Sequence, residues 1–291
     1  MGFEIRRLNG PFGAEVLGLT EPRALARDDV QRLNRAWVNH VVLCLREQHV
    51  APDGLLRLAR LFGTPARQPL QRAEYQVPGY PELRVLSSEH VDTHGDKKPL
   101  YTGGSWHTDH SHLPEPPWGT MLHAIALPSR GGQTSFTDQT AAFAALSGED
   151  KSRFEGLMGH HIYLSKYSKR RLQAMTAEER AAAPSARHPL VRRHDVTGRP
   201  ALYFNPVRIE QFDGMTEAAS QALLAQLTAH CEREQFVYRH SWQLGDVLIW
   251  DNRQALHKVA HDYPAGELRL MHRTLVGSTA LAEAMRGGPE T

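Results

Sequence analysis

The chain has 291 residues, of which 41% are hydrophobic and 23% charged, and this composition is ordinary for a globular protein. Its 34 lysines and arginines nearly balance 32 acidic residues, which disfavours nucleic acid as a partner, and two cysteines cannot build a disulfide framework or a cysteine-rich zinc site. The first residues lack the apolar run of a signal peptide and no apolar stretch approaches the roughly 18 residues that span a bilayer, so we expect a cytoplasmic protein that does not enter a membrane.

Short strands dominate the predicted elements. Runs rich in alternating or continuous apolar residues predict strands or hairpins at 3–19, 41–45, 83–87, 120–127, 133–136, 191–205, 236–242, 246–250 and 268–276. Helical spacing and capping residues predict helices that begin near Asp28 or Asp29, Asp53, Thr140, Ser147 and Thr216.

Residues 165–187 differ in composition from the segments around them. They are rich in lysine, arginine and alanine and contain almost no large apolar side chains, so they cannot belong to the core. A solvated helical excursion is one interpretation. A lid over a functional site is the other, because the segment lies between two motifs that carry histidines.

The order of elements favours one domain over residues 1–291, because the sequence contains neither an internal repeat nor an internal linker. Strands that flank the histidine motifs lie far apart in the chain. This arrangement suits a mostly β fold with flanking helices and a double-stranded β-helix (jelly-roll, cupin-like) core better than a parallel sheet.

The stretch Trp106-His107-Thr108-Asp109 carries the clearest chemistry. In an extended segment, residues i and i+2 point to the same face, so His107 and Asp109 can aim an imidazole and a carboxylate at one point. Two histidines and one carboxylate favour non-haem Fe(II), because three adjacent positions on the metal stay open. His257, which closes the later segment 250–257, is the candidate third ligand.

Other interpretations of the motif are less consistent with its order. A zinc hydrolase motif of the type His-x-His-x-Asp-His needs two histidines before the aspartate, whereas here His110 and His112 follow Asp109. Structural zinc sites are usually four-coordinate and rich in cysteine. A polar loop without a metal remains open for the short motif alone. We expect His110 to line the pocket, and we assign no role to His112.

Several segments taken together resemble the taurine dioxygenase/TfdA family of Fe(II)- and 2-oxoglutarate-dependent dioxygenases. The resemblance is collinear from about residue 3 to residue 278. The matching segments are Gly13 to Val16, Trp106 to Asp109, Pro128 to Thr134, Phe204-Asn205, Trp250 to Arg253 with His257, and Arg269 to Arg273.

The resemblance implies that His107, Asp109 and His257 bind Fe(II), and that Thr134 and Arg269 hold the distal carboxylate of 2-oxoglutarate. The planar fork of an arginine suits a carboxylate. The implied reaction consumes O2 and 2-oxoglutarate, hydroxylates a substrate carbon and releases succinate and CO2. Where that carbon bears nitrogen, oxygen or sulfur, the hydroxylated product can then fragment.

Arg273 matches the arginine that in this family commonly reads an anionic group on the primary substrate. Four residues along a predicted strand place it on the same face as Arg269 and roughly 13 Å away. Buried arginines need anionic partners. We therefore expect a substrate with a carboxylate, sulfonate or sulfate group, while a role of Arg273 toward 2-oxoglutarate stays open.

Tyr101, His161 and Asn205 are further candidate substrate-binding residues by rough alignment or proximity, and a structural role is equally consistent with the sequence. Gln68 and Gly103 stand where taurine-cleaving members carry polar residues that grip taurine, which disfavours taurine itself.

Trp106 and Trp250 are expected to support the site by packing, and Asp251 by hydrogen bonding.

Two alternatives remain beside a dioxygenase that hydroxylates a small anion. One is a biosynthetic oxygenase of the same family that acts on an amino-acid-derived or natural-product substrate. Halogenation is disfavoured because Asp109 is present. The other is a jelly-roll protein that only binds its ligand, which the intact ligand set argues against. The resemblance also suggests a homo-oligomer.

Overall fold

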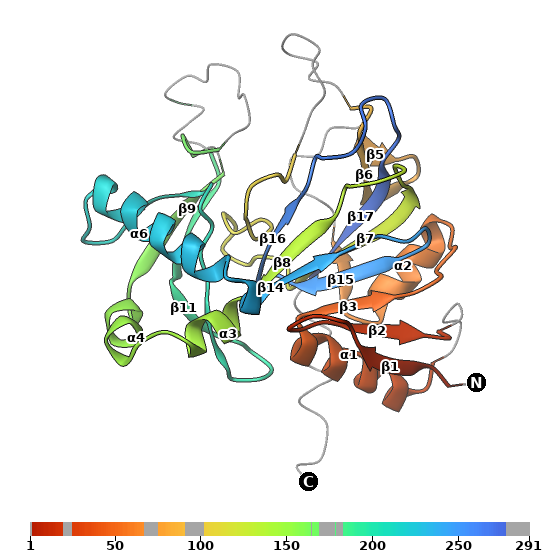
Figure 1. The fold of residues 1–291 in the computed structure, drawn as a ribbon, viewed down its shortest axis with the longest axis horizontal. Helices are drawn as coiled ribbons and strands as arrows, with labels where there is room; N and C mark the ends of the chain where they lie inside the picture. Colours follow the sequence, from red (N-terminus) through yellow and green to blue (C-terminus); the bar gives the residue numbers. More distant parts are fainter. Residues whose placement is uncertain are drawn as a thin grey trace.

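The computed structural model describes residues 2–19, 25–66, 75–90, 102–163, 165–168, 178 and 183–277. Figure 1 shows two parts side by side, with a large sheet on the right and a smaller part carrying most of the later helices on the left. The strands β8, β14 and β16 lie between them. None of the helices in these ranges is both long and apolar enough to cross a membrane.

The main sheet joins strands from both ends of the chain. Its order is β1 (Glu4–Arg7), β2 (Ala14–Leu17), β3 (Val42–Leu45), β15 (Val247–Asp251), β7 (Gly119–Ala126), β17 (Leu270–Gly277), β6 (Tyr80–Ser87) and β5 (Gln76–Val77), with β4 (Thr64–Ala66) paired to β17. The pair β2 and β3 is parallel, whereas β15, β7 and β17 are antiparallel to their neighbours.

A second sheet has the order β14 (Val237–His240), β8 (Thr134–Asp138) and β16 (Ala255–Val259). One apolar cluster takes Phe136 and Tyr238 from this sheet and Leu122, Trp250 and Met271 from the main sheet. Side chains of the two sheets therefore pack against each other. This sandwich is the core of a jelly roll, as predicted from the sequence.

The opposite face of the main sheet is covered by α1 (Arg27–His40) and α2 (Pro52–Arg60). Both faces of β3 are buried, which explains its continuous apolar run. Leu43 and Leu45 belong to the cluster that contains the helices, whereas Val42 and Cys44 belong to the cluster between the sheets. A strand that is buried on both faces has no position left for a polar side chain.

The first two helices begin differently from the prediction. Their N-caps are Ala26 and Ala51, and neither side chain makes a capping hydrogen bond. The predicted caps, Asp28 or Asp29 and Asp53, lie instead in the first turn, where a carboxylate interacts favourably with the helix dipole. The cap at Ser147 is confirmed, because its hydroxyl accepts a hydrogen bond from the backbone N–H of Asp150.

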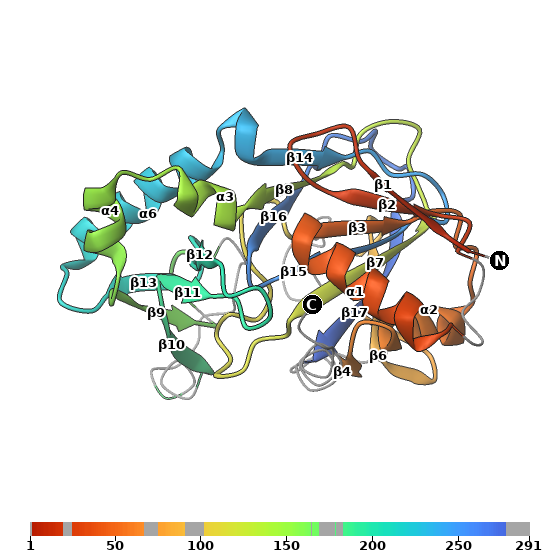
Figure 2. The same cartoon turned by 90° about the horizontal axis from the view of Figure 1, so that it is seen from below.

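The smaller part packs a third apolar cluster around three helices. These are α3 (Gln139–Ala144), α4 (Gly148–Phe154) and α6 (Glu217–Cys231), and Figure 2 shows them away from α1 and α2. The η2 turn (Glu234–Phe236) follows α6. Small sheets complete this part: β10 (Ser185–Pro189) with β9 (Met158–Ile162) and β13 (Ile209–Phe212), and the predicted hairpin of β11 (Val191–Arg193) and β12 (Pro200–Leu202).

Sequence reasoning missed β9, β13 and the end of the proposed lid. Residues 185–187 belong to β10 and pair with β9, so this end is part of a sheet rather than a helical excursion. Most of residues 169–182 lie outside the described residues. A lid over the site therefore stays a prediction.

A buried charge cluster fixes the turn after β15. The carboxylate of Asp251, which is fully buried, accepts hydrogen bonds from His194 at 2.8 Å and from Arg253 at 2.8 and 2.7 Å. Burial would raise the pKa of Asp251, but Arg253 and then His194 outweigh it and hold the pKa well below its usual range. The cluster ties the β15–β16 connection to the β11–β12 hairpin.

We predict that Asp251→Asn lowers the free energy of unfolding by about 3–5 kcal/mol at pH 7, because it leaves the buried Arg253 without its main countercharge. Urea unfolding measures the difference. Since the folded pKa of Asp251 lies below the unfolded value of about 3.9, its stabilisation is present above that pH and is lost as the pH falls toward the folded pKa. The difference between wild type and variant should narrow below about pH 4.

Asp195→Asn is the matched control, because Asp195 faces the same arginine at 3.7 Å with a side chain that is 42% exposed. We expect a loss below about 1 kcal/mol. Equal losses in the two variants would contradict the role given to Asp251.

Candidate active site

A single backbone pairing brings the two candidate histidine ligands together. His107 and His257 form an antiparallel bridge in which each backbone N–H donates to the other residue's carbonyl, at 3.0 and 2.9 Å. Because paired positions across antiparallel strands project to the same face, the two imidazoles lie side by side with centroids 4.1 Å apart. The segment before Asp109 thus extends the second sheet along β16.

The ligand atoms of His107, Asp109 and His257 face one shared space and all lie within 4.8 Å of one another. Nε2 of His107 is 3.9 Å from Oδ1 of Asp109, and Nε2 of His257 is 3.8 Å from its Oδ2. These distances are too long for hydrogen bonds. Three ligand atoms that face one another without forming hydrogen bonds are an arrangement that fits a metal ion.

Both imidazoles are kept in the form that binds metals. Burial lowers the pKa of His107, and it lowers the pKa of His257 further. Nδ1 of His107 lies 2.8 Å from the carbonyl oxygen of Ser105, so Nδ1–H donates there and the lone pair of Nε2 faces the shared space.

The carboxylate of Asp109 is held by two further residues. The hydroxyl of Thr120 donates to Oδ2 at 2.7 Å, and Nη1 of Arg273 lies 3.5 Å from Oδ1. Burial would raise the pKa of Asp109, but Arg273, His257 and His107 outweigh it and hold the pKa well below its usual range. Asp109 is therefore an anion at neutral pH, as a metal ligand must be.

Two residues that the sequence reasoning did not single out support this loop. Thr120 donates to Asp109, and Asn252 donates to the hydroxyl of Thr120 at 2.9 Å. The carbonyl oxygen of Asn252 also accepts a hydrogen bond from the hydroxyl of Thr108 at 2.9 Å. The sequence could have pointed to Asn252, because it directly follows Asp251 in the matched motif. It could not have pointed to Thr120, because a threonine in a strand is ordinary.

Arg269 is a buried cation with hydrogen-bonding capacity to spare. The residue is 8% exposed, its Nε–H donates to the carbonyl of Gly132 at 3.2 Å, and its Nη2 has no hydrogen-bond partner among the described residues. Burial lowers its pKa to about 10. Thr134, 2% exposed, lies two residues beyond Gly132 on β8. A buried guanidinium with an unused donor, bonded two residues along the chain from a buried hydroxyl, fits a carboxylate ligand.

Gly132 permits this approach of Arg269. Its φ is +71°, and a Cβ there would lie 3.1 Å from both Cδ and Nε of Arg269. A side chain at this position would be strained and would crowd the guanidinium. The Gly131-Gly132 pair in the matched motif therefore has a steric reason.

The three described residues that the sequence suggested for substrate binding have different surroundings in the structure. Arg273 lies beside Asp109. The side-chain amide of Asn205 donates to the carbonyl of Thr108 at 2.9 Å and to the hydroxyl of Ser111 at 3.1 Å, so it holds the loop that carries the candidate ligand Asp109. His161 is fully buried in β9. The substrate contacts of Asn205 and His161 stay predictions.

Tyr101 and Gln68 lie outside the described residues, so the roles inferred for them from the sequence stay predictions as well.

His110 and His112 are not among the converging ligands. Burial lowers the pKa of His110 to about 3 and that of His112 to about 4, so both rings are neutral near pH 7. His110 has a φ of 52°, and its ring lies 5.5 Å from that of His112. They line the region beside Asp109.

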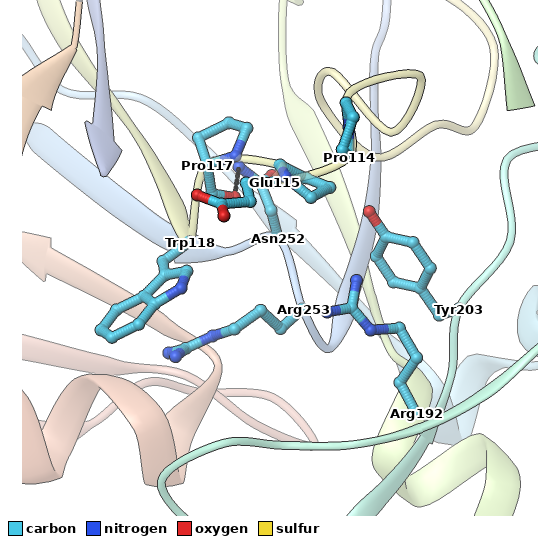
Figure 3. A pocket seen from close by; sticks show the side chains of 9 residues that line it. Pro114, Glu115, Pro117, Trp118, Arg192, Tyr203, Asn252 and Arg253 are labelled. Carbon is cyan, nitrogen blue, oxygen red and sulfur yellow. Dashed lines mark hydrogen bonds between the residues drawn. The ribbon is translucent and has the colours of Figure 1, made fainter. Parts of the chain in front are cut away.

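A cavity of about 220 Å³ has Asn252 in its lining, the residue that also accepts the hydrogen bond from Thr108. Figure 3 shows Arg253 extended below Trp118 and Arg192 beside Tyr203. The guanidinium groups lie over those rings at 4.6 and 4.5 Å. Arg253 in this cavity is already paired with Asp251, whereas Arg269 keeps an unused donor. Arg269 is therefore the better candidate for binding a carboxylate.

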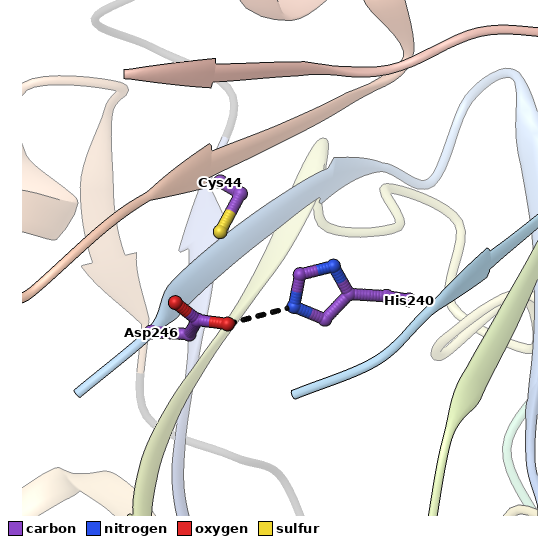
Figure 4. Close-up of side chains that lie close together, drawn as sticks. All are labelled: Cys44, His240 and Asp246. Carbon is purple, nitrogen blue, oxygen red and sulfur yellow. Dashed lines mark hydrogen bonds and ion pairs between the residues drawn. The ribbon is translucent and has the colours of Figure 1, made fainter. Parts of the chain in front are cut away.

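A second group of potential metal ligands consists of Cys44, His240 and Asp246. Figure 4 shows two of its side chains bonded to each other: Nε2 of His240 is 3.0 Å from Oδ2 of Asp246. Arg46 donates to the same oxygen at 2.8 Å. Burial raises the pKa of the Cys44 thiol, which stays protonated. An arginine in contact and a neutral thiol both disfavour a cation here.

Comparisons with known proteins agree with this geometry. Residues 4–275 match the family model described as taurine catabolism dioxygenase TauD, TfdA family. One relative, named (S)-phenoxypropionate/alpha-ketoglutarate-dioxygenase from Sphingobium herbicidovorans, is 31% identical over 97% of this chain and 98% of its own. Another, named alpha-ketoglutarate-dependent 2,4-dichlorophenoxyacetate dioxygenase from Cupriavidus pinatubonensis, is 32% identical over 85% of this chain and 88% of its own.

The fold agrees as well. A crystal structure described as AAD-2 in complex with Mn(II) and N-oxalylglycine superposes with a TM-score of 0.80 at 28% identity and covers 96% of this chain and 98% of that one. The family uses Fe(II), 2-oxoglutarate and O2. The chain belongs to the TauD/TfdA family and is an Fe(II)- and 2-oxoglutarate-dependent dioxygenase.

Proposed function

We propose that His107, Asp109 and His257 bind the Fe(II) ion of this dioxygenase. The observation that carries the proposal is the convergence of two neutral imidazoles and one carboxylate on a shared space without hydrogen bonds among them. When bound there with 2-oxoglutarate and O2, the iron supplies the oxidant that hydroxylates a C–H bond, with succinate and CO2 as products.

Thr134 and Arg269 hold the distal carboxylate of 2-oxoglutarate in this proposal. Arg269 supplies the buried positive charge and the unused Nη2 donor, and Thr134 supplies a hydroxyl. The protein thereby fixes the co-substrate at the end remote from the metal. The 2-oxo acid end of the co-substrate would then reach the metal held by the three ligands.

The primary substrate that we propose is a small carboxylic acid that carries an ether oxygen, as an aryloxyalkanoate does. Arg273, 3.5 Å from Asp109, would hold the substrate's anionic group near the metal-binding carboxylate. Two relatives carry names of aryloxyalkanoate dioxygenases. Hydroxylation of the carbon that bears the ether oxygen gives a hemiacetal, which releases a hydroxyl compound and leaves a carbonyl compound.

The activity is tested by succinate formation from 2-oxoglutarate with Fe(II), ascorbate and O2 across a panel of aryloxyalkanoates, alkyl sulfates and sulfonates. We expect the aryloxyalkanoates to give the largest stimulation. Arg273→Met should raise the KM of the best substrate by about 10-fold or more, because a charge-assisted contact contributes roughly 1.5–3 kcal/mol. Stimulation by sulfates alone would contradict the carboxylate assignment.

Metal binding tests the ligand set. His107→Ala should weaken Mn(II) or Fe(II) binding by more than about 100-fold, since even the loss of a residue that supports a ligand costs up to that much. Isothermal titration with Mn(II) measures it. His112→Ala is the control and should bind metal within about 3-fold of wild type. A similar loss in both variants would mean that the site was misplaced or the fold disturbed.

Arg269→Ala should weaken 2-oxoglutarate binding to Mn(II)-loaded protein by at least about 30-fold, because truncating one partner of a buried charge pair costs roughly 2 kcal/mol or more. The affinity for Mn(II) itself should stay unchanged. Wild-type affinity for 2-oxoglutarate in this variant would reject the assignment.

A further inference from the structure

Thr134 receives a hydrogen bond that decides what its own hydroxyl can do. Nε1 of Trp242 lies 3.0 Å from Oγ1 of Thr134. An indole N–H can only donate, so the threonine oxygen is the acceptor. The hydroxyl hydrogen of Thr134 is then left to donate to another group. Because Thr134 is only 2% exposed, bulk water does not readily accept this hydrogen bond.

The geometry points to Trp242 as a positioning residue that turns the hydroxyl of Thr134 toward the distal carboxylate of 2-oxoglutarate. This inference rests on the proposed function, in which Thr134 and Arg269 hold that carboxylate. Without the indole donor, the hydroxyl could rotate to donate elsewhere before the co-substrate arrives. With it, the hydroxyl presents a donor beside the buried cation.

Trp242 is itself held in place by a buried polar chain. Its ring meets that of His240 edge to face, with centroids 4.8 Å apart and an angle of 86°. His240 lies between the hydroxyl of Tyr238, 2.8 Å from Nδ1, and the carboxylate of Asp246, 3.0 Å from Nε2. Because burial lowers the pKa of His240, its ring is neutral, with Nε2–H donating to Asp246 and Nδ1 accepting from Tyr238.

The strand register joins this chain to the co-substrate subsite. His240 pairs directly with Thr134 across β14 and β8. Trp242 follows β14 by two residues and reaches back to the side chain of Thr134. His240, which Figure 4 shows bonded to Asp246, thus packs against the indole and supports it. This gives a function to a group of side chains that does not suit a metal.

The test is a double-mutant cycle read out as 2-oxoglutarate affinity for Mn(II)-loaded protein. Trp242→Phe keeps a ring against His240 and removes the donor, and we expect a loss of about 3- to 10-fold. In a Thr134→Val background the same substitution should have no further effect. Thr134→Ser should keep both the wild-type affinity and the sensitivity to Trp242→Phe. Mn(II) affinity and thermal stability serve as controls for folding.

The outcomes separate this inference from the proposed function. If wild type does not bind 2-oxoglutarate, the proposed function fails. If wild type binds but Trp242→Phe has no effect, or adds fully to Thr134→Val, only the positioning role fails.

A second measurement does not depend on the folding of Trp242→Phe. In ¹⁵N-indole spectra, one resonance should shift in Thr134→Val and the same one on addition of 2-oxoglutarate to wild type. A resonance that moves in only one of these experiments, or in neither, overturns the inference.

Discussion

The active site depends on two backbone hydrogen bonds between residues 150 positions apart, 107 and 257. The bridge between His107 and His257 is a pair of N–H to carbonyl bonds along β16. It sets the two imidazoles side by side and directs Asp109 from the next turn toward them. Because backbone pairing does not depend on the side chains, it places the two candidate imidazole ligands together and leaves their Nε2 atoms available for a metal.

Charge balance is the second constraint on this site. Asp109 is buried as an anion and is matched by Arg273 and by a hydrogen bond from the hydroxyl of Thr120. Arg269 is buried as a cation whose Nη2 has no hydrogen-bond partner within the described part of the chain. Arg273 therefore stabilises the carboxylate of the candidate ligand Asp109, and Arg269 keeps a donor that is free for an anion from outside. The unused donor of Arg269 carries a positive charge that the carboxylate of a bound dicarboxylate could neutralise.

The sequence was sufficient where a local pattern carries its own physical meaning. The spacing of His107 and Asp109 on one face needs no tertiary information. The apolar run of β3 indicates a strand buried on both faces, and the glycines before Thr134 indicate a turn. The predictions failed where local signals are weak. Caps at Asp28 and Asp53 were expected from residue type, but a carboxylate in the first turn satisfies the same electrostatic preference.

By itself the sequence determined the fold class and indicated which residues could hold a metal. It predicted Arg269 and Arg273 on one strand, whereas Arg269 lies just before β17. Only the tertiary structure decided which groups meet. It placed Arg273 against Asp109, paired the amide of Asn205 with the carbonyl of Thr108, and brought Trp242 onto Thr134. These contacts join residues that are 97 to 164 positions apart. Periodicity and spacing report on one segment at a time, whereas such contacts depend on the register between segments, which is set when the two sheets pack together.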